Sequence, residues 1–212
     1  MRTWFHASLL LMLLAALPAQ AGHHQWFISE IFSNADGTVQ FVELKGTSDN
    51  EQFINGFNVA TLGPEGVVPS SAPIGPNLPS NLTNGAYLLI ATTGYATLAT
   101  AQGAPAPDRT LPNNFLEING DRVRYASIAA TDRAYGAGVL PTNGIFSLDY
   151  EVGSPGTTFN TPQNFAGATG SINAAGPGVP SLSRVGLIAL LGCVVMAAAF
   201  KLRQRADAGA AA

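Results

Sequence analysis

Residues 25–45 read QWFISEIFSNADGTVQFVELK, and this stretch decides the fold. Two runs rich in β-branched and aromatic residues, Gln25–Ser33 and Thr38–Lys45, flank the turn sequence NADG at residues 34–37. Such runs around an Asp-Gly turn are typical of a β-hairpin. The chain therefore opens its folded part with two antiparallel strands.

The same pattern of short apolar runs separated by turn residues continues to about residue 150. Five further strands are expected at Gln52–Leu62, Tyr87–Thr92, Phe115–Asn119, Arg122–Ser127 and Ile145–Tyr150. Only Tyr95–Gln102 fits one or two helical turns, and the proline-rich segment Gly63–Thr83 is expected to be a long exposed loop. Seven short strands with Gly, Pro and Asn between them predict an all-β domain built as a β-sandwich.

Composition excludes several classes of protein. The chain has 212 residues, of which 47% are hydrophobic and only 11% are charged, and its formal net charge is −3. A nucleic-acid-binding protein needs clustered Lys and Arg, so that class is not expected. The single cysteine, Cys193, excludes an intramolecular disulfide and a structural cysteine–zinc site.

The N-terminal segment, residues 1–21, has the layout of a secretory signal peptide. Arg2 is followed by the apolar run Ala7–Leu17, then by Pro18 and the small-residue site Ala19-Gln20-Ala21. This layout predicts export through the Sec pathway and cleavage after Ala21. An uncleaved anchor is the alternative, but a membrane-spanning helix needs about 20 apolar residues.

The C-terminal end predicts a membrane segment. Residues 171–184 are expected to form a flexible stalk and a sorting motif, residues 185–205 a transmembrane helix with a basic end, and residues 206–212 a tail. A buried core helix is the alternative, but this helix has no polar face. By the positive-inside rule, three basic residues should stay cytoplasmic: Lys201, Arg203 and Arg205.

This end resembles the bacterial sorting signals of the PEP-CTERM type, most closely the IPTL-CTERM variety. The likeness rests on Val179-Pro180-Ser181-Leu182-Ser183, the apolar helix and the basic end. Arg184 and Val185 depart from the acidic and Trp residues that usually follow the motif. The resemblance implies membrane anchoring that is at least transient, a processing enzyme at 179–183, and delivery to the cell surface or the extracellular space.

The domain at residues 22–170 resembles lamin-tail-type domains. The matching residues are ISEI at 28–31, FVEL at 41–44, NGF at 55–57, Gly85 with LLIA at 88–91, Pro107-Asp108, Phe115-Leu116, Asn119-Gly120, LPTNG at 140–144, Ser147-Leu148 and Ser154-Pro155-Gly156. This family has an immunoglobulin-like β-sandwich and is generally non-catalytic. The resemblance therefore implies a structural or binding role.

Two glutamates in the opening hairpin are the first candidates for chemistry. A turn that pairs Ser33 with Thr38 is the register we predict, and in that register Ile28 lies opposite Glu43. Glu30 and Glu43 then share one face as diagonal neighbours, about 7–8 Å apart. Glycosidases place two carboxylates about 5–9.5 Å apart, which keeps a secreted hydrolase as an alternative. The other interpretation is a solvated or hydrogen-bonded strand face.

Metal binding has two possible sites, each with a simpler interpretation. After cleavage, Gly22-His23-His24 offers four nitrogens in the square-planar set that suits Cu(II) or Ni(II), or it is a chance polar start. Ser48-Asp49-Asn50-Glu51 offers oxygens for calcium, or it is a solvated loop. His23 and His24 are the only histidines after the signal peptide, which argues against a Ser-His mechanism.

Aromatic side chains leave a third possibility open. Five of them could stack on sugar rings, although aromatics in strands more often belong to the core: Trp26, Tyr87, Phe115, Tyr125 and Tyr135. We predict no catalytic, cofactor-binding or metal-binding residue and no enzyme. The sequence favours an exported structural or adhesive protein of the cell envelope or extracellular matrix, in contact with extracellular polysaccharide. A secreted carbohydrate- or metal-binding module is the alternative.

Overall fold

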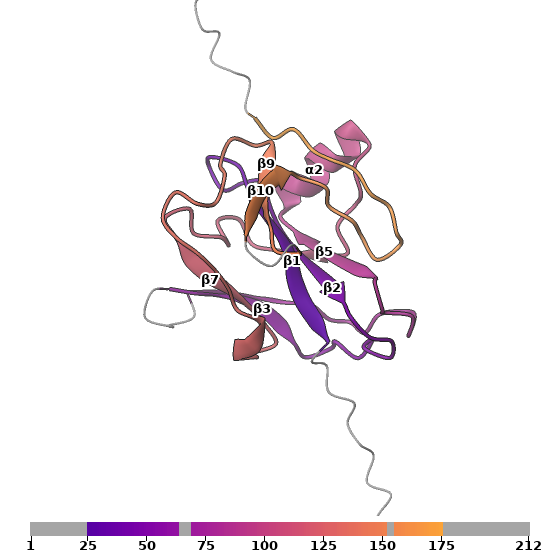
Figure 1. Ribbon diagram of the computed structural model, residues 1–212. Helices are drawn as coiled ribbons and strands as arrows, with labels where there is room; N and C mark the ends of the chain where they lie inside the picture. The colour runs from indigo at the N-terminus through magenta and orange to yellow at the C-terminus, as the bar shows by residue number, and fades with distance from the viewer. Residues whose placement is uncertain (1–24, 64–68, 152–154, 176–212) are drawn as a thin grey trace, which may run out of the picture. The chain divides into compact units, whose positions relative to one another are not determined.

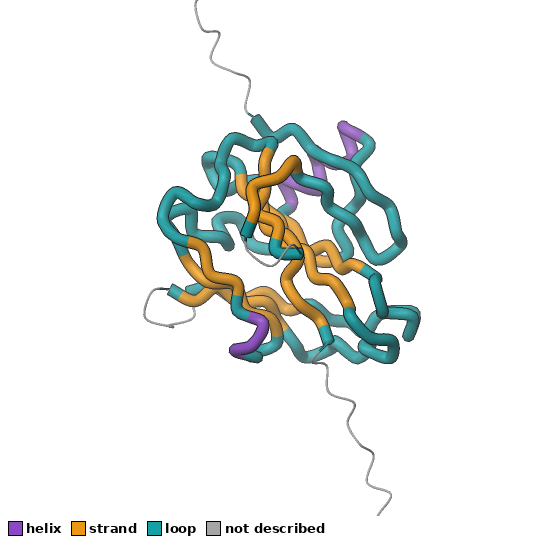
Figure 2. Tube along the Cα trace, in the orientation of Figure 1, coloured by secondary structure: helices purple, strands orange, loops and turns teal. Residues whose placement is uncertain are grey.

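The computed structural model describes residues 25–63, 69–151 and 155–175 (Figure 1). These residues form two β-sheets and one short α-helix (Figure 2). No helix in the described part of the chain is long and apolar enough to cross a membrane. The predicted signal peptide, the sorting motif and the helix at 185–205 lie outside the described residues.

The larger sheet has six strands and the smaller sheet has four. The order of the first is β10 (Gly156–Phe159), β9 (Phe146–Asp149), β1 (Trp26–Ser33), β2 (Gln40–Gly46), β5 (Tyr87–Ala91) and β6 (Arg109–Thr110). The order of the second is β4 (Ser70–Pro73), β3 (Asn58–Leu62), β7 (Asp121–Tyr125) and β8 (Arg133–Tyr135). Neighbouring strands are antiparallel, except that β5 and β6 are parallel. The helix α2 spans Thr93–Gln102, and a 3₁₀ turn, η1, spans Ala129–Thr131.

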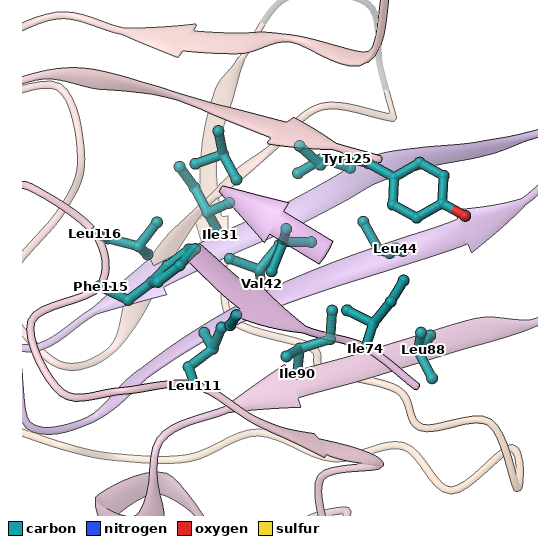
Figure 3. Packing of buried hydrophobic residues seen from close by; sticks show 14 of the residues in the cluster. Ile31, Val42, Leu44, Ile74, Leu88, Ile90, Leu111, Phe115, Leu116 and Tyr125 are labelled. Atoms are coloured by element: carbon teal, nitrogen blue, oxygen red, sulfur yellow. The ribbon is translucent and has the colours of Figure 1, made fainter. Parts of the chain in front are cut away.

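The hydrophobic core lies between the two sheets, which is consistent with the predicted β-sandwich (Figure 3). Ile31, Val42 and Ile90 of the larger sheet pack with Val123 and Tyr125 of the smaller one, and all five are fully buried. Burying one such side chain contributes about 1.5–3 kcal/mol, so this layer is the main source of stability.

Two sequence predictions about loops and strands are wrong, and the strand predicted at Gln52–Leu62 is confirmed only for β3, Asn58–Leu62. Phe115–Asn119 is not a strand, although Phe115 and Leu116 are buried in the core. The proline-rich segment 63–83 is not an exposed loop throughout, because it contains β4 and buries Ala72 and Ile74. In both places apolar side chains are buried in the core, but the backbone that carries them does not form a long strand with alternating inward and outward side chains.

The hairpin register also differs from the prediction. Ser33 pairs with Gln40 rather than with Thr38, so the turn is two residues longer than expected. Asp36 accepts hydrogen bonds from the backbone N–H and the hydroxyl of Thr38, at 3.0 and 2.6 Å, and this fixes Thr38 within the turn. The Asn34 side chain accepts the N–H of residue 39 at 3.0 Å, which holds that residue in the turn as well.

A β-bulge in β1 then decides which side chains face inward. The pairing of β1 with β2 shifts between Ile28 and Glu30, which leaves Ser29 as an extra residue. Ile28 and Ile31 both reach the core between the sheets, although they are three positions apart. The bulge restores the alternation after Ile28 and sends Glu30 to the outer face.

The outer face of the six-stranded sheet carries a second apolar cluster. Phe32 and Phe41 stack with ring centroids 5.2 Å apart, and Phe41 meets the ring of Tyr95 edge-on at 5.6 Å. Tyr95 comes from α2, whereas Ile172 reaches the cluster from the C-terminal segment. The helix and that segment therefore form a covering layer on this face. The described packing continues through Ala175, beyond residue 171, where the sequence predicts a stalk to begin.

Candidate functional site: a carboxylate-lined pocket

A pocket of about 550 Å³ lies on the outer face of the six-stranded sheet. It is lined by Ser29, Glu30, Glu43, Tyr87, Asp149, Glu151, Thr161, Gln163, Thr169, Gly170 and Ser171. Four of these residues are acids from β1, β2, β9 and the turn after β9. A concave site on which several polar groups converge is the default candidate for binding or catalysis.

The register places the two predicted glutamates directly opposite each other. Glu30 pairs with Glu43 across β1 and β2, so they are not the diagonal neighbours that the sequence predicts. Directly opposed residues have Cβ atoms about 4.5–5.5 Å apart. Both side chains are almost fully buried, with exposed fractions of 4% and 3%.

Each glutamate accepts hydrogen bonds from the chain around it. An oxygen of Glu30 accepts the backbone N–H of Thr161 at 3.1 Å. One oxygen of Glu43 accepts the Ser29 hydroxyl at 2.7 Å, and the other accepts the N–H of Gln163 at 2.6 Å. The hydrogen-bonded interpretation of this strand face is therefore confirmed.

Burial raises the pKa of both glutamates. Desolvation, followed by the neighbouring charge of Glu30, raises the pKa of Glu43 to about 8, and the Ser29 and Gln163 hydrogen bonds oppose this only in part. Desolvation likewise raises the pKa of Glu30 to about 7, against the opposing effect of Ser147 and Thr161. Two adjacent carboxyls without a counter-ion favour the neutral form.

The base Lys45 is already paired at the rim of the pocket. Lys45 Nζ lies 2.7 Å from a carboxylate oxygen of Glu151, and the Tyr87 hydroxyl donates to the other oxygen of Glu151 at 2.8 Å. In the described part of the chain, no ion pair includes Glu30 or Glu43. Among the described residues, Glu30 and Glu43 on the floor of the pocket thus have no counter-ion, whereas Glu151 at the rim is paired with Lys45.

The C-terminal segment that covers the pocket, residues 160–175, will be called the strap. Alternate backbone N–H groups of the strap point at carboxylates: Thr161 at Glu30, Gln163 at Glu43, and residue 165 at Asp108, the last at 2.9 Å. The same Asp108 oxygen accepts the N–H of residue 89 on β5, also at 2.9 Å. The carboxylates of these three acids thus accept the backbone N–H groups that, in a sheet, would donate to the carbonyls of a neighbouring strand.

Two carboxamide side chains complete the attachment of the strap. Each makes a pair of hydrogen bonds that we call an amide clip. In each clip a side chain both donates to and accepts from the backbone of one residue. Asn160 does this with Ile172, at 2.8 Å in both directions, and Gln102 of α2 does it with Asn173, at 3.0 and 2.8 Å. The strap is therefore held mainly by side chains.

The structure adds no support for the two metal sites considered in the sequence. Asp49 accepts the N–H of Asn84 at 3.0 Å, and Asn50 accepts from the Asn81 side chain at 3.1 Å, so the proposed calcium loop is engaged by its neighbour. Within residues 25–63, 69–151 and 155–175, no group of three or more His, Cys, Asp or Glu could hold a metal ion. Gly22-His23-His24 lies outside those ranges.

Four of the five aromatic candidates are core residues, as the sequence favours: Trp26, Phe115, Tyr125 and Tyr135. Tyr87 alone lines the pocket. Sequence reasoning missed Asp149 and Glu151 as pocket residues and Asp108 as an acceptor for the strap, because each reaches its partners through long-range contacts. The one available signal was the uncharged, Asn- and Thr-rich stretch after residue 151, whose backbone groups need polar partners from elsewhere.

No protein-family model, curated protein or solved structure matches this chain. The comparisons therefore bear neither on the lamin-tail resemblance of the domain nor on the sorting-signal resemblance of the C-terminal end.

Proposed function

We propose that the protein is an exported structural or adhesive component of the cell envelope or extracellular matrix. Its working part is a lamin-tail-like, immunoglobulin-like β-sandwich at residues 22–170, delivered by the signal peptide and sorted by the C-terminal signal. The two-sheet core and the order of the sequence motifs support this assignment.

The observation that carries the proposal is the use of the pocket carboxylates. Glu30 and Glu43 are the groups best placed for acid–base chemistry, yet they bind backbone N–H groups of the strap. A general acid or base must be within hydrogen-bond reach of substrate. Carboxylates that hold the fold together favour a structural domain over a catalytic one.

The test compares strains that differ only in this chain. Cells lacking the protein are expected to lose aggregation or matrix retention, and the full chain should restore it. The full chain carrying Glu30→Gln and Glu43→Gln should restore it equally, because the neutral amides keep the shape of the pocket floor. If the wild-type chain restores the property and the variant does not, although the variant is folded and present in equal amount, the structural role is wrong.

Sorting is tested by cell fractionation. The full chain should reach the cell surface or the medium, beginning at residue 22, whereas Pro180→Ala with Leu182→Ala should accumulate in the membrane. Pro177→Ala, just upstream of the motif, is the matched control and should behave as wild type. Identical distribution of all three chains contradicts a sorting motif at 179–183.

One observation favours a second candidate, a carbohydrate-active hydrolase or sugar-binding module. Two opposed carboxyls with a raised pKa, in a pocket that Tyr87 also lines, form a pattern that glycosidases use. A screen of polysaccharide hydrolysis decides between the two. An activity present in wild type and lost in Glu43→Gln would replace the structural proposal.

A further inference from the structure

The strap crosses the outer face of the sheet without joining it. In Figure 1 it runs as the last coloured segment of the chain, beyond β10. Within the described residues it forms no strand, only an isolated bridge between Gln163 and Thr169. Half of its residues are exposed, and Pro162 and Ile172 are its buried apolar residues. Its attachment combines these few apolar contacts with hydrogen bonds to carboxyl and amide side chains.

The groups that surround the glutamate pair add negative charge or none. Asp149 on β9 acts on Glu30, and Glu151 acts on Glu43. Tyr95 of α2 lies near enough that both glutamates raise its pKa. Tyr87 lines the pocket from β5, and Lys45 on β2 is paired with Glu151. Ionising both glutamates therefore places two adjacent charges in a buried, acidic site.

We propose that residues 160–175 are a pH-released strap, in which loss of protons from Glu30 and Glu43 detaches the strap and opens the pocket beneath it. Water then reaches the two carboxylates. Ile172 leaves the cluster of Phe32 and Phe41 on the outer face. The core between the sheets lies on the opposite face of β1 and β2, and the strap contributes to it only through the partly buried Phe165, so the sandwich stays folded.

The direction of the pH dependence follows from linkage. With the strap closed, burial raises the pKa of Glu30 to about 7 and that of Glu43 to about 8 from the ordinary value of 4.5, although the N–H groups of Thr161 and Gln163 act to lower them. Between pH 4.5 and about 8, the closed form therefore keeps protons on the two glutamates that the open form has released. The strap is most firmly closed below pH 4.5 and opens progressively as the pH rises towards 8.

Hydrogen exchange on the full-length protein in detergent, read by mass spectrometry, tests the proposal. Peptides covering residues 160–172 are compared with peptides covering 87–91 of β5, at pH 5.5 and pH 8, with labelling times scaled for the intrinsic exchange rate. We expect protection of 160–172 to fall by about tenfold or more between the two pH values, while that of β5 stays constant.

Three variants complete the test. Glu30→Gln with Glu43→Gln should remove the pH dependence, because neither amide titrates. Glu117→Gln, which neutralises an exposed acid in the loop before β7, should leave it unchanged. The wild-type measurement alone can overturn the proposal, even if the double variant fails to fold. Constant protection of 160–172, or an equal loss in β5, shows that no strap is released.

Discussion

Gln40 makes a buried hydrogen-bond network whose removal should be costly. Its side chain is fully buried, and its Nε2 donates to the Ser33 hydroxyl and to the carbonyl of Leu116, both at 3.0 Å. Its Oε1 accepts the N–H of Leu116 at 3.1 Å, so Gln40 and Leu116 form a third amide clip. Gln40→Met keeps the length and volume of the side chain but removes both halves of this clip.

The expected loss follows from the two backbone groups left behind. The N–H and C=O of Leu116 would remain buried without a partner, and each orphaned group costs about 1–3 kcal/mol. Gln40→Met should therefore lower the free energy of unfolding by about 2–6 kcal/mol, out of the roughly 5–15 kcal/mol typical of a folded domain. Urea unfolding of the full-length protein at pH 7 measures this directly.

The strap supplies a matched control. Gln102 makes the same clip with Asn173, but both residues are exposed. Water replaces the lost partner there, so Gln102→Met should change the free energy of unfolding by only about 0.5 kcal/mol. Equal effects of the two substitutions, or a loss at Gln40 below about 1 kcal/mol, would refute the argument that burial sets the cost.

Two further predictions concern charge and backbone packing. The free energy of unfolding should fall between pH 5 and pH 8.5, because the folded chain keeps protons on Glu43 that the unfolded chain releases. A pKa raised from 4.5 to about 8 corresponds to a loss of at most about 5 kcal/mol. Chemical denaturation at several pH values measures this loss, and Glu43→Gln should flatten the pH dependence. Gly46→Ala should destabilise by about 2–3 kcal/mol or more, because its Cβ would lie 2.1 Å from the carbonyl oxygen of Thr83. Gly136→Ala meets only ordinary contact at 3.6 Å and should stay within about 1 kcal/mol of wild type, so equal melting temperatures of the two variants would contradict the clash.

Sequence reasoning predicted the strands whose own side chains carry the pattern. β1, β5 and β9 lie within predicted runs, and β2 ends and β7 begins one residue outside theirs, since alternating or continuous apolar residues are buried there. It failed where the hydrogen-bond partner of the backbone comes from a distant side chain. Leu116 is apolar and buried, but it pairs with a glutamine 76 positions away instead of with a strand.

The two glutamates of the site are predictable from the sequence, but its other acids and the register are not. Glu30 and Glu43 were recognised as sharing one face, which holds. The spacing of Ile28 and Ile31 in ISEI carried the signal of a bulge, because two inward residues three positions apart break strict alternation. The strap could not have been foreseen, since its bonds to the two glutamates span 131 and 120 residues.

The attachment of the strap also has a mechanical consequence. The described chain enters at Gln25 and leaves at Ala175, and Figure 1 shows these points at opposite ends of the domain. Gln25 leads into β1, which is flanked by β9 and β2, so tension at that end loads many ladder bonds together. Tension at Ala175 reaches the strap bonds one after another and peels them at lower force. The strap would then be drawn out, up to a fully extended length of about 50 Å at roughly 3.3 Å per residue, before any strand of the sandwich carries load.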